Sequence, residues 1–117
     1  MANYCSITDK YYTQSQIDSR LSKAYREKHE GNGYAECRGC GGKADDNSHT
    51  ISQKRCKHIH KVALIWNPDN MVDLCRCCHQ IWEVGGEEAK KLFCYDECME
   101  FVRLHDEEGF NKRIYLQ

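Results

Sequence analysis

The chain has 117 residues, of which 17 are lysine or arginine and 18 are aspartate or glutamate, giving a formal net charge of −1. A chain of this length forms one domain with a modest core. Because the net charge is close to zero, net charge alone gives no support for nucleic acid binding. No apolar run approaches the roughly 18 residues of a membrane span, and the first ten residues lack the basic and apolar regions of a signal peptide.

The cysteine content points to metal rather than to disulfide bonds. Nine cysteines are an odd number, and without an export signal a disulfide framework is not expected. Paired C-x-x-C spacing in an intracellular chain predicts a metal site instead. We therefore expect a reduced, cytoplasmic protein.

Residues 1–36 are expected to form an N-terminal helical arm. A helix from Gln16 to Glu30 is predicted, capped by Thr13 or Ser15 and ended by the glycines of residues 31–33. Apolar residues recur at helical spacing and basic residues fill much of the remainder. The apolar stripe is expected to pack on the rest of the domain, and the basic face is a candidate for contact with a phosphate backbone; the two interpretations are compatible.

Two cysteine pairs predict a structural zinc site. Cys37 and Cys40 form the first C-x-x-C pair, and Cys75 and Cys78 form the second, with 34 residues between the two pairs. Zinc prefers a tetrahedron of thiolates, and each C-x-x-C turn delivers two of them. A structural zinc supplies on the order of 10 kcal/mol of folding free energy in small domains. Redox chemistry or unrelated buried thiols are the alternatives, and the matched spacing disfavours them.

The other cysteines carry weaker predictions. Cys77 crowds the second pair, where the 75/78 pairing is preferred because it repeats the first. Cys94 and Cys98 fall on one face of a predicted helix, either as ligands of a second metal or, as we favour, as buried thiols. Cys56 lies near two histidines and is a candidate for a minor zinc role. Nothing functional is assigned to Cys5.

The middle of the chain predicts strand, loop, strand, turn and helix. A short strand is expected at 48–52, a basic loop at 53–61, a buried strand at 62–66 and a turn at 67–70. An extended piece at 71–74 precedes a helix that ends at Gly85 and Gly86. The basic segment at 53–61 and the arginine of the predicted helix are the best candidates for DNA backbone contact, and a merely solvated loop is the alternative. These residues are Lys54, Arg55, Lys57, His58, His60, Lys61 and Arg76.

The C-terminal flank, residues 85–117, is expected to contain one helix from Glu87 to His105. Its acidic residues would keep this side away from DNA. Gly109 is expected to end the helical region, and Phe110–Gln117 to form a short strand or tail. The flank is a candidate surface for a homodimer.

The segment from 37 to 84 resembles the HNH endonucleases, in the zinc-containing branch of the ββα-metal (His-Me finger) superfamily. The resemblance rests on three motifs: Cys37-x-x-Cys40, Ser48-His49-Thr50-Ile51, and Asn70-Met71-Val72-Asp73-Leu74-Cys75-x-x-Cys78-His79. It implies an α+β fold with a small zinc-stapled core at 37–84, flanked by a helix on each side. The small size is similar to that of phage or mobile-element accessory proteins, which work in a bacterial or phage-infected cytoplasm.

The resemblance also implies a role for three residues. His49 would be the general base that activates water for attack on a DNA phosphodiester. Asn70 would pin the loop and orient His49. His79 would ligate a catalytic divalent metal, Mg²⁺, Mn²⁺ or Ni²⁺, that is separate from the structural zinc.

One position departs from the family pattern. Family members usually carry an aspartate or histidine directly before the general base, and here that place is Ser48, a poor ligand for a divalent ion. Asp45 and Asp46 lie a few residues upstream and are candidates to replace this ligand, although their spacing is wrong for a direct exchange. From the resemblance as a whole we expect a metal-dependent DNA endonuclease. The alternatives are a catalytically weakened or inactive DNA-binding module of the same fold and a protein-interaction module.

Overall fold

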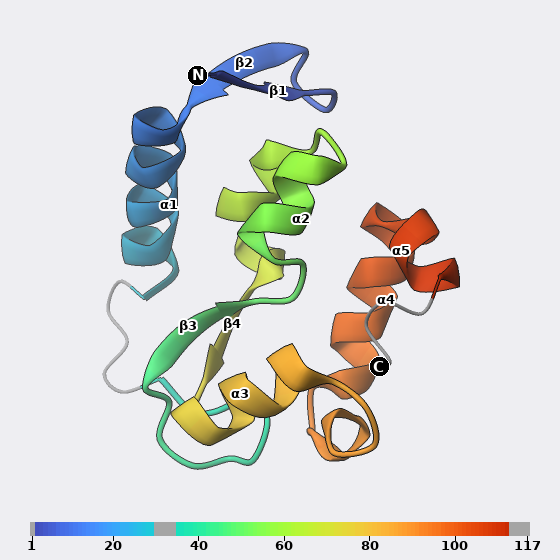
Figure 1. Ribbon diagram of the computed structural model, residues 1–117. Coiled ribbons are helices and arrows are strands. Elements are labelled where there is room, and N and C mark those ends of the chain that lie inside the picture. Colours follow the sequence, from blue (N-terminus) through green and yellow to red (C-terminus); the bar gives the residue numbers. More distant parts are fainter. Residues whose placement is uncertain (1, 30–34, 113–117) are drawn as a thin grey trace. The chain divides into compact units, whose positions relative to one another are not determined.

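The computed structural model describes residues 2–29 and 35–112. It is a small α+β protein with two short antiparallel sheets of two strands each (Figure 1). The chain forms two compact units that cut across the three expected segments. The first contains Met1–Asn32 and Ile51–Met71, and the second contains Gly33–Thr50 and Val72–Gln117. The predicted glycine stop at 31–33 and the end of the predicted tail lie outside the described residues.

The first unit opens with a hairpin that the sequence analysis did not predict. Strands β1 (Ala2–Cys5) and β2 (Lys10–Thr13) pair antiparallel. Helix α1 (Gln14–His29) follows at once, beginning two residues earlier than expected. The unit is completed by α2 (Gln53–His58) and two 3₁₀ helices, η1 (Val62–Trp66) and η2 (Pro68–Asn70).

A reciprocal cap fixes the start of α1. The backbone N–H of Gln16 donates to Thr13 Oγ1 at 3.2 Å, and the backbone N–H of Thr13 donates to Gln16 Oε1 at 2.8 Å. This capping box satisfies two backbone donors that a helix start leaves without partners. Of the two expected caps, Thr13 is therefore the one used.

The core of the first unit lies between α1, the hairpin and η1. Ile17, Val62 and Ile65 are fully buried, so α1 packs its apolar stripe on η1. The rings of Tyr12 and Trp66 meet edge to face, with centroids 5.0 Å apart. The guanidinium of Arg20 lies over both rings, at 5.2 and 5.4 Å, so this basic residue of α1 stabilises the unit by cation–π contact.

Two predictions for this stretch were wrong. The basic segment expected as a loop is helix α2, capped by the Ser52 side chain, which accepts a hydrogen bond from the backbone N–H of Arg55. The run at 62–66 expected as a strand is η1, although Val62, Leu64 and Ile65 are buried as predicted. A short apolar run without alternation does not distinguish a buried strand from a buried helical turn.

The second unit carries the other sheet and three helices. Strand β3 (Asp46–His49) pairs with β4 (Met71–Leu74), whose first residue belongs to the first unit. Helix α3 (Arg76–Val84) follows and ends at Gly85, which has a φ of 77°. The strand before α3, the helix and its glycine stop were all predicted. The strand at 48–52 was expected too late, because β3 begins at Asp46.

The C-terminal flank is broken where one helix was expected. The 3₁₀ helix η3 (Ala89–Lys91) precedes α4 (Tyr95–His105), and α5 (Glu107–Asn111) follows. Gly109 lies inside α5 instead of ending the helical region, and its N–H donates to Asp106 Oδ1, the cap of that helix, at 3.1 Å. None of the helices in the described part of the chain has both the length and the apolar character to cross a membrane.

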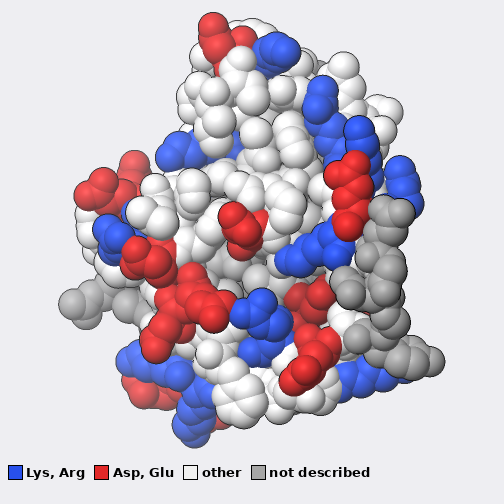
Figure 2. Space-filling view, turned by 180° about the vertical axis from the view of Figure 1, so that it is seen from behind, with Lys and Arg blue, Asp and Glu red and all other residues white. Residues whose placement is uncertain are grey.

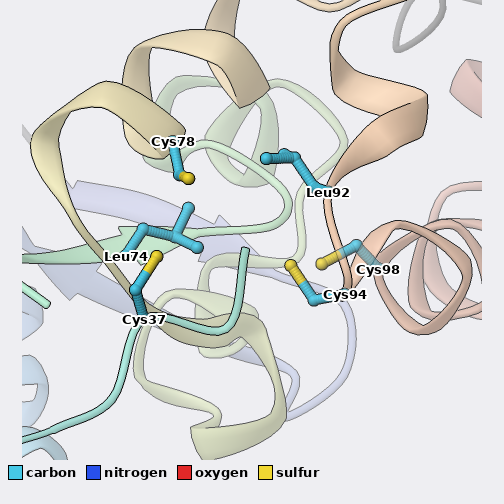
Figure 3. Packing of buried hydrophobic residues seen from close by; sticks show 6 residues of the cluster. All are labelled: Cys37, Leu74, Cys78, Leu92, Cys94 and Cys98. Atoms are coloured by element: carbon cyan, nitrogen blue, oxygen red, sulfur yellow. The ribbon is translucent and has the colours of Figure 1, made fainter. Parts of the chain in front are cut away.

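The core of the second unit is built largely from sulfur. Figure 3 shows six buried side chains that pack together in it. They are Cys37, Leu74, Cys78, Leu92, Cys94 and Cys98. Leu92 and the thiols of the C-terminal flank thus belong to the same buried cluster as two of the predicted metal ligands.

The capping box gives a test of the first unit. Thr13→Ala removes the side-chain acceptor of the Gln16 N–H and is expected to lower the free energy of unfolding by about 1 kcal/mol. Urea denaturation followed by circular dichroism measures the change. Ser15→Ala is the matched control, because Ser15 is exposed inside the helix and should change stability by a few tenths of a kcal/mol at most. Equal effects of the two substitutions would contradict the assignment of Thr13 as the cap.

Candidate metal centre and its surroundings

Four cysteines from two distant stretches of sequence meet in the second unit. Cys37 and Cys40 come from the turn before β3, Cys75 is the N-cap of α3, and Cys78 lies in the first turn of α3. Their sulfur atoms all lie within 4.8 Å of one another, and Cys40 Sγ is 3.9 Å from Cys75 Sγ. A tetrahedron with Zn–S bonds of about 2.3 Å has edges of about 3.8 Å. The four cysteines are therefore positioned to bind a metal ion such as zinc.

The first cysteine turn, residues 37–42, contains three glycines, and two of them lie where a larger residue would clash or be strained. A Cβ atom at Gly39 would come within 2.9 Å of both Cβ and Sγ of Cys78, so no larger residue fits there without displacing α3. Gly41 has a φ of 83°, which side chains disfavour. The Cys37 N–H donates to the Gly42 carbonyl at 2.7 Å and closes the turn.

Backbone N–H groups point at the cysteine sulfurs. The Gly39 N–H donates to Cys37 Sγ and the Cys78 N–H to Cys75 Sγ, each at 3.4 Å. Burial would raise the pKa of Cys37, but backbone N–H groups of Cys75, Gly39 and Cys40 lower it to about 6. Burial and the neighbouring thiols raise the pKa of Cys78. Four thiolates cannot coexist here without a cation, so metal binding must release protons.

The remaining cysteines do not extend the cluster. Cys77 is exposed and lies outside the cluster. Cys94 and Cys98 are buried thiols, as favoured, and Figure 3 shows their sulfurs pointing toward each other. Cys56 is buried in the first unit, where its thiol donates to the Ile51 carbonyl at 3.5 Å. In the described part of the chain, the four clustered cysteines are the only group of three or more metal-binding side chains that lie together.

His79 contacts two carboxylates. Its Nδ1 lies 3.0 Å from Asp46 Oδ2, on β3, and its Nε2 lies 3.1 Å from Glu83 Oε1, one turn further along α3. Arg76 Nη2 lies 3.3 Å from the other oxygen of Asp46. Hydrogen bonds from His79 and then from Arg76 hold the pKa of Asp46 below its usual range. Arg76, expected at a DNA phosphate, is thus paired with Asp46 in this structure.

Asp46 was not selected from the sequence as a site residue. The predicted strand began at Ser48, which left Asp46 in a loop. Because the strand begins at Asp46, residues 46 and 48 lie on the same face by the two-residue period of a strand. Ser48 itself is buried and lines the interior with Thr50, Trp82 and Cys98. Ser48, the residue before His49, is therefore part of the interior packing. Asp46, two residues earlier, is the carboxylate nearest in sequence on the same face of the strand.

Asn70 is a fully buried amide that bonds to backbone on two sides. Its Oδ1 accepts from the Ile51 N–H at 2.7 Å, and its Nδ2 donates to the carbonyls of Ile51 and Leu64, each at 3.0 Å. Ile51 follows His49 by two residues. The side chain of Asn70 thus fixes the chain just beyond His49, which is half-buried at the end of β3.

The predicted DNA-contact residues lie on α2 and the turn after it, in the first unit. Lys54, His58 and His60 are exposed, whereas Arg55, Lys57 and Lys61 are half-buried. Lys57 donates to Gln14 Oε1 at 2.5 Å, so it also ties α2 to the start of α1.

Comparison of the chain with protein-family models, with curated proteins and with solved structures found no match in any of the three.

The cluster predicts how metal content depends on individual residues. Purified protein is expected to carry about one zinc per chain, and Cys40→Ser is expected to remove it, since three thiolates bind zinc far more weakly than four. Elemental analysis by mass spectrometry measures the content. Cys77→Ser is the matched control and should keep the metal, because Cys77 is an exposed cysteine outside the cluster. His79→Ala should also keep it. Loss of zinc on His79→Ala would show that His79 belongs to the structural site.

Proposed function

We propose that the protein is a metal-dependent DNA endonuclease of the HNH type. The observation that carries this proposal is the pairing of Asp46 with His79, a carboxylate and an imidazole that meet beside the four-cysteine cluster. The motifs Ser48-His49-Thr50-Ile51 and Asn70 to His79 supply the family resemblance.

The Asp46–His79 pair fits a small divalent cation. Two ligands at about 2.1 Å from one octahedral ion, at right angles to each other, are about 3.0 Å apart. Asp46 Oδ2 and His79 Nδ1 are separated by 3.0 Å. Mg²⁺ and Mn²⁺ commonly bind through few protein ligands and keep positions for water and phosphate. Asp46 would thus supply the ligand that Ser48 cannot. Such an ion would stabilise the charge that develops on a phosphate during hydrolysis.

Of the other residues, one would accept a proton and the rest would hold the site in place. His49 stands three residues after Asp46 on β3, and its imidazole would take the proton of the attacking water near neutral pH. Asn70 would hold the following backbone through its bonds to Ile51. The cluster of Cys37, Cys40, Cys75 and Cys78 would fix α3, and with it His79, one residue after the last ligand.

DNA is the proposed substrate because positive charge is concentrated in one unit of a chain whose net charge is close to zero. The first unit holds nine lysines and arginines against five acidic residues, while the second holds eight against thirteen. Backbone phosphates would be contacted by the exposed cations of α2 and α1. No residue is assigned to base readout, so recognition would rest on backbone and shape.

Plasmid nicking tests the proposed function. Supercoiled DNA is incubated with protein and Mg²⁺, Mn²⁺ or Ni²⁺, and the nicked product is measured on gels. His49→Ala is expected to lower the rate by about 100-fold or more, because a general base contributes roughly that much. His105→Ala is the control and should retain most of the activity, because His105 is a histidine of α4 outside the proposed catalytic and DNA-contact residues.

The proposed role of Asp46 is tested by comparing Asp46→Asn with the same substitution at the neighbouring Asp45. Asp46→Asn is expected to raise the divalent metal concentration needed for half-maximal nicking by about tenfold or more, since it weakens one of two protein ligands. Asp45→Asn, an exposed carboxylate one residue earlier, should leave that concentration unchanged. Absence of cleavage with all three metals, combined with retained DNA binding, would instead support a binding module of the same fold. Loss of both activities would support a protein-interaction module.

A further inference from the structure

The outer face of the N-terminal hairpin displays a pair of tyrosines. Tyr4 on β1 and Tyr11 on β2 are direct cross-strand partners, with ring centroids 5.1 Å apart. Alternation along the strands sends Cys5 and Tyr12 inward, where both are buried. Tyr11 is 68% exposed. Its ring is thus supported by Tyr4 and open to solvent.

A third ring extends this surface. The His60 ring lies 6.4 Å from that of Tyr4. Its backbone is held by Ser6, whose N–H and Oγ both donate to the His60 carbonyl, at 2.7 and 3.0 Å. His60 has a φ of 58°, a conformation that such residues rarely adopt. The rings of Tyr4, Tyr11 and His60, called here the aromatic face, therefore lie near one another on one surface of the unit.

One cation lies close to the aromatic face, in a unit of positive net charge. Lys57 lies three residues before His60 and is held beside the end of β2 through Gln14. Lys10 is exposed but pairs with Cys5, on the face of the hairpin opposite to Tyr4 and Tyr11. The first unit as a whole carries an excess of four positive charges. Figure 2 shows lysine and arginine side chains along α1, with a few acidic ones among them. Asp9 is the acidic residue nearest the rings, and its carboxylate accepts a hydrogen bond from Tyr4 Oη at 2.7 Å.

We propose that the aromatic face binds single-stranded nucleic acid, with an unpaired base stacked on Tyr11 and a flanking phosphate near Lys57. Exposed aromatic rings among cations are the combination that single-stranded nucleic acid uses, because every base has a π-face and every nucleotide a phosphate. Paired bases in a duplex are already stacked and do not present this face. This inference rests on the proposed function in taking nucleic acid as the partner. It does not depend on the chemistry of cleavage. It adds a preference for unpaired segments.

Fluorescence anisotropy tests the aromatic face. A labelled oligothymidylate and the duplex that it forms with oligoadenylate are titrated with zinc-loaded protein, without added divalent metal, so that no cleavage occurs. The wild type is expected to bind the single strand more tightly than the duplex. Tyr11→Ala is expected to weaken single-strand binding by about tenfold, the effect of losing one base–aromatic stack, and to change duplex binding by less than about twofold. Tyr11→Trp should restore single-strand binding.

Tyr25→Ala is the matched control, because Tyr25 is an exposed tyrosine of α1 in the same unit. It should leave single-strand binding unchanged. The proposal is overturned if the wild type does not prefer the single strand, or if Tyr11→Ala binds it as well as the wild type does. Circular dichroism and zinc content verify that each variant is folded. Failure of the nuclease proposal is a separate result: His49→Ala would then nick as well as the wild type while single-strand binding remained.

Discussion

The four-cysteine cluster is the constraint on which the second unit depends. It connects the turn at 37–40 to the start of α3, although 34 residues separate the two pairs. The surrounding core is small, and much of it consists of sulfur, so apolar burial alone supplies little stability. The closeness of Gly39 to Cys78 shows how tightly the two pairs are brought together. A bound metal would also remove the repulsion among thiolates that limits their ionisation in its absence.

The same cluster determines where the candidate chemistry lies. His79 follows the last cysteine directly, so the first turns of α3 hold both the structural ligands and the imidazole. Asp46 reaches that imidazole from β3, Glu83 contacts it from the next turn of α3, and Arg76 pairs with Asp46. Two of the clustered cysteines and the imidazole proposed to act in catalysis thus lie at or near the start of a single short helix. A change in one of the cysteines would consequently disturb the imidazole as well.

Sequence patterns predicted the features that depend on local spacing. The four cysteines, strand β4, and helix α3 with its glycine stop followed from motif spacing and periodicity. The patterns failed where tertiary contacts decide the outcome. The run at 62–66 has no alternation, and its 3₁₀ form reflects burial on α1 and the hairpin. Asp46 was considered only as a substitute for Ser48 and was not selected, because the start of β3 was placed two residues late and element boundaries carry little local signal. Tyr4 and Tyr11 were not linked, because their pairing depends on a hairpin that was not predicted.

The unequal division of charge between the two units has a consequence for the behaviour of the protein in solution. A net charge of −1 suggests a molecule that is nearly indifferent to ionic strength. The two units carry opposite charges, however, so each can attract the other unit of a neighbouring molecule. Such attraction acts at low salt and fades as the Debye length shrinks to about 8 Å at physiological ionic strength. The protein would therefore be least soluble in dilute buffer and dissolve better as salt is added, as proteins with separated charges do.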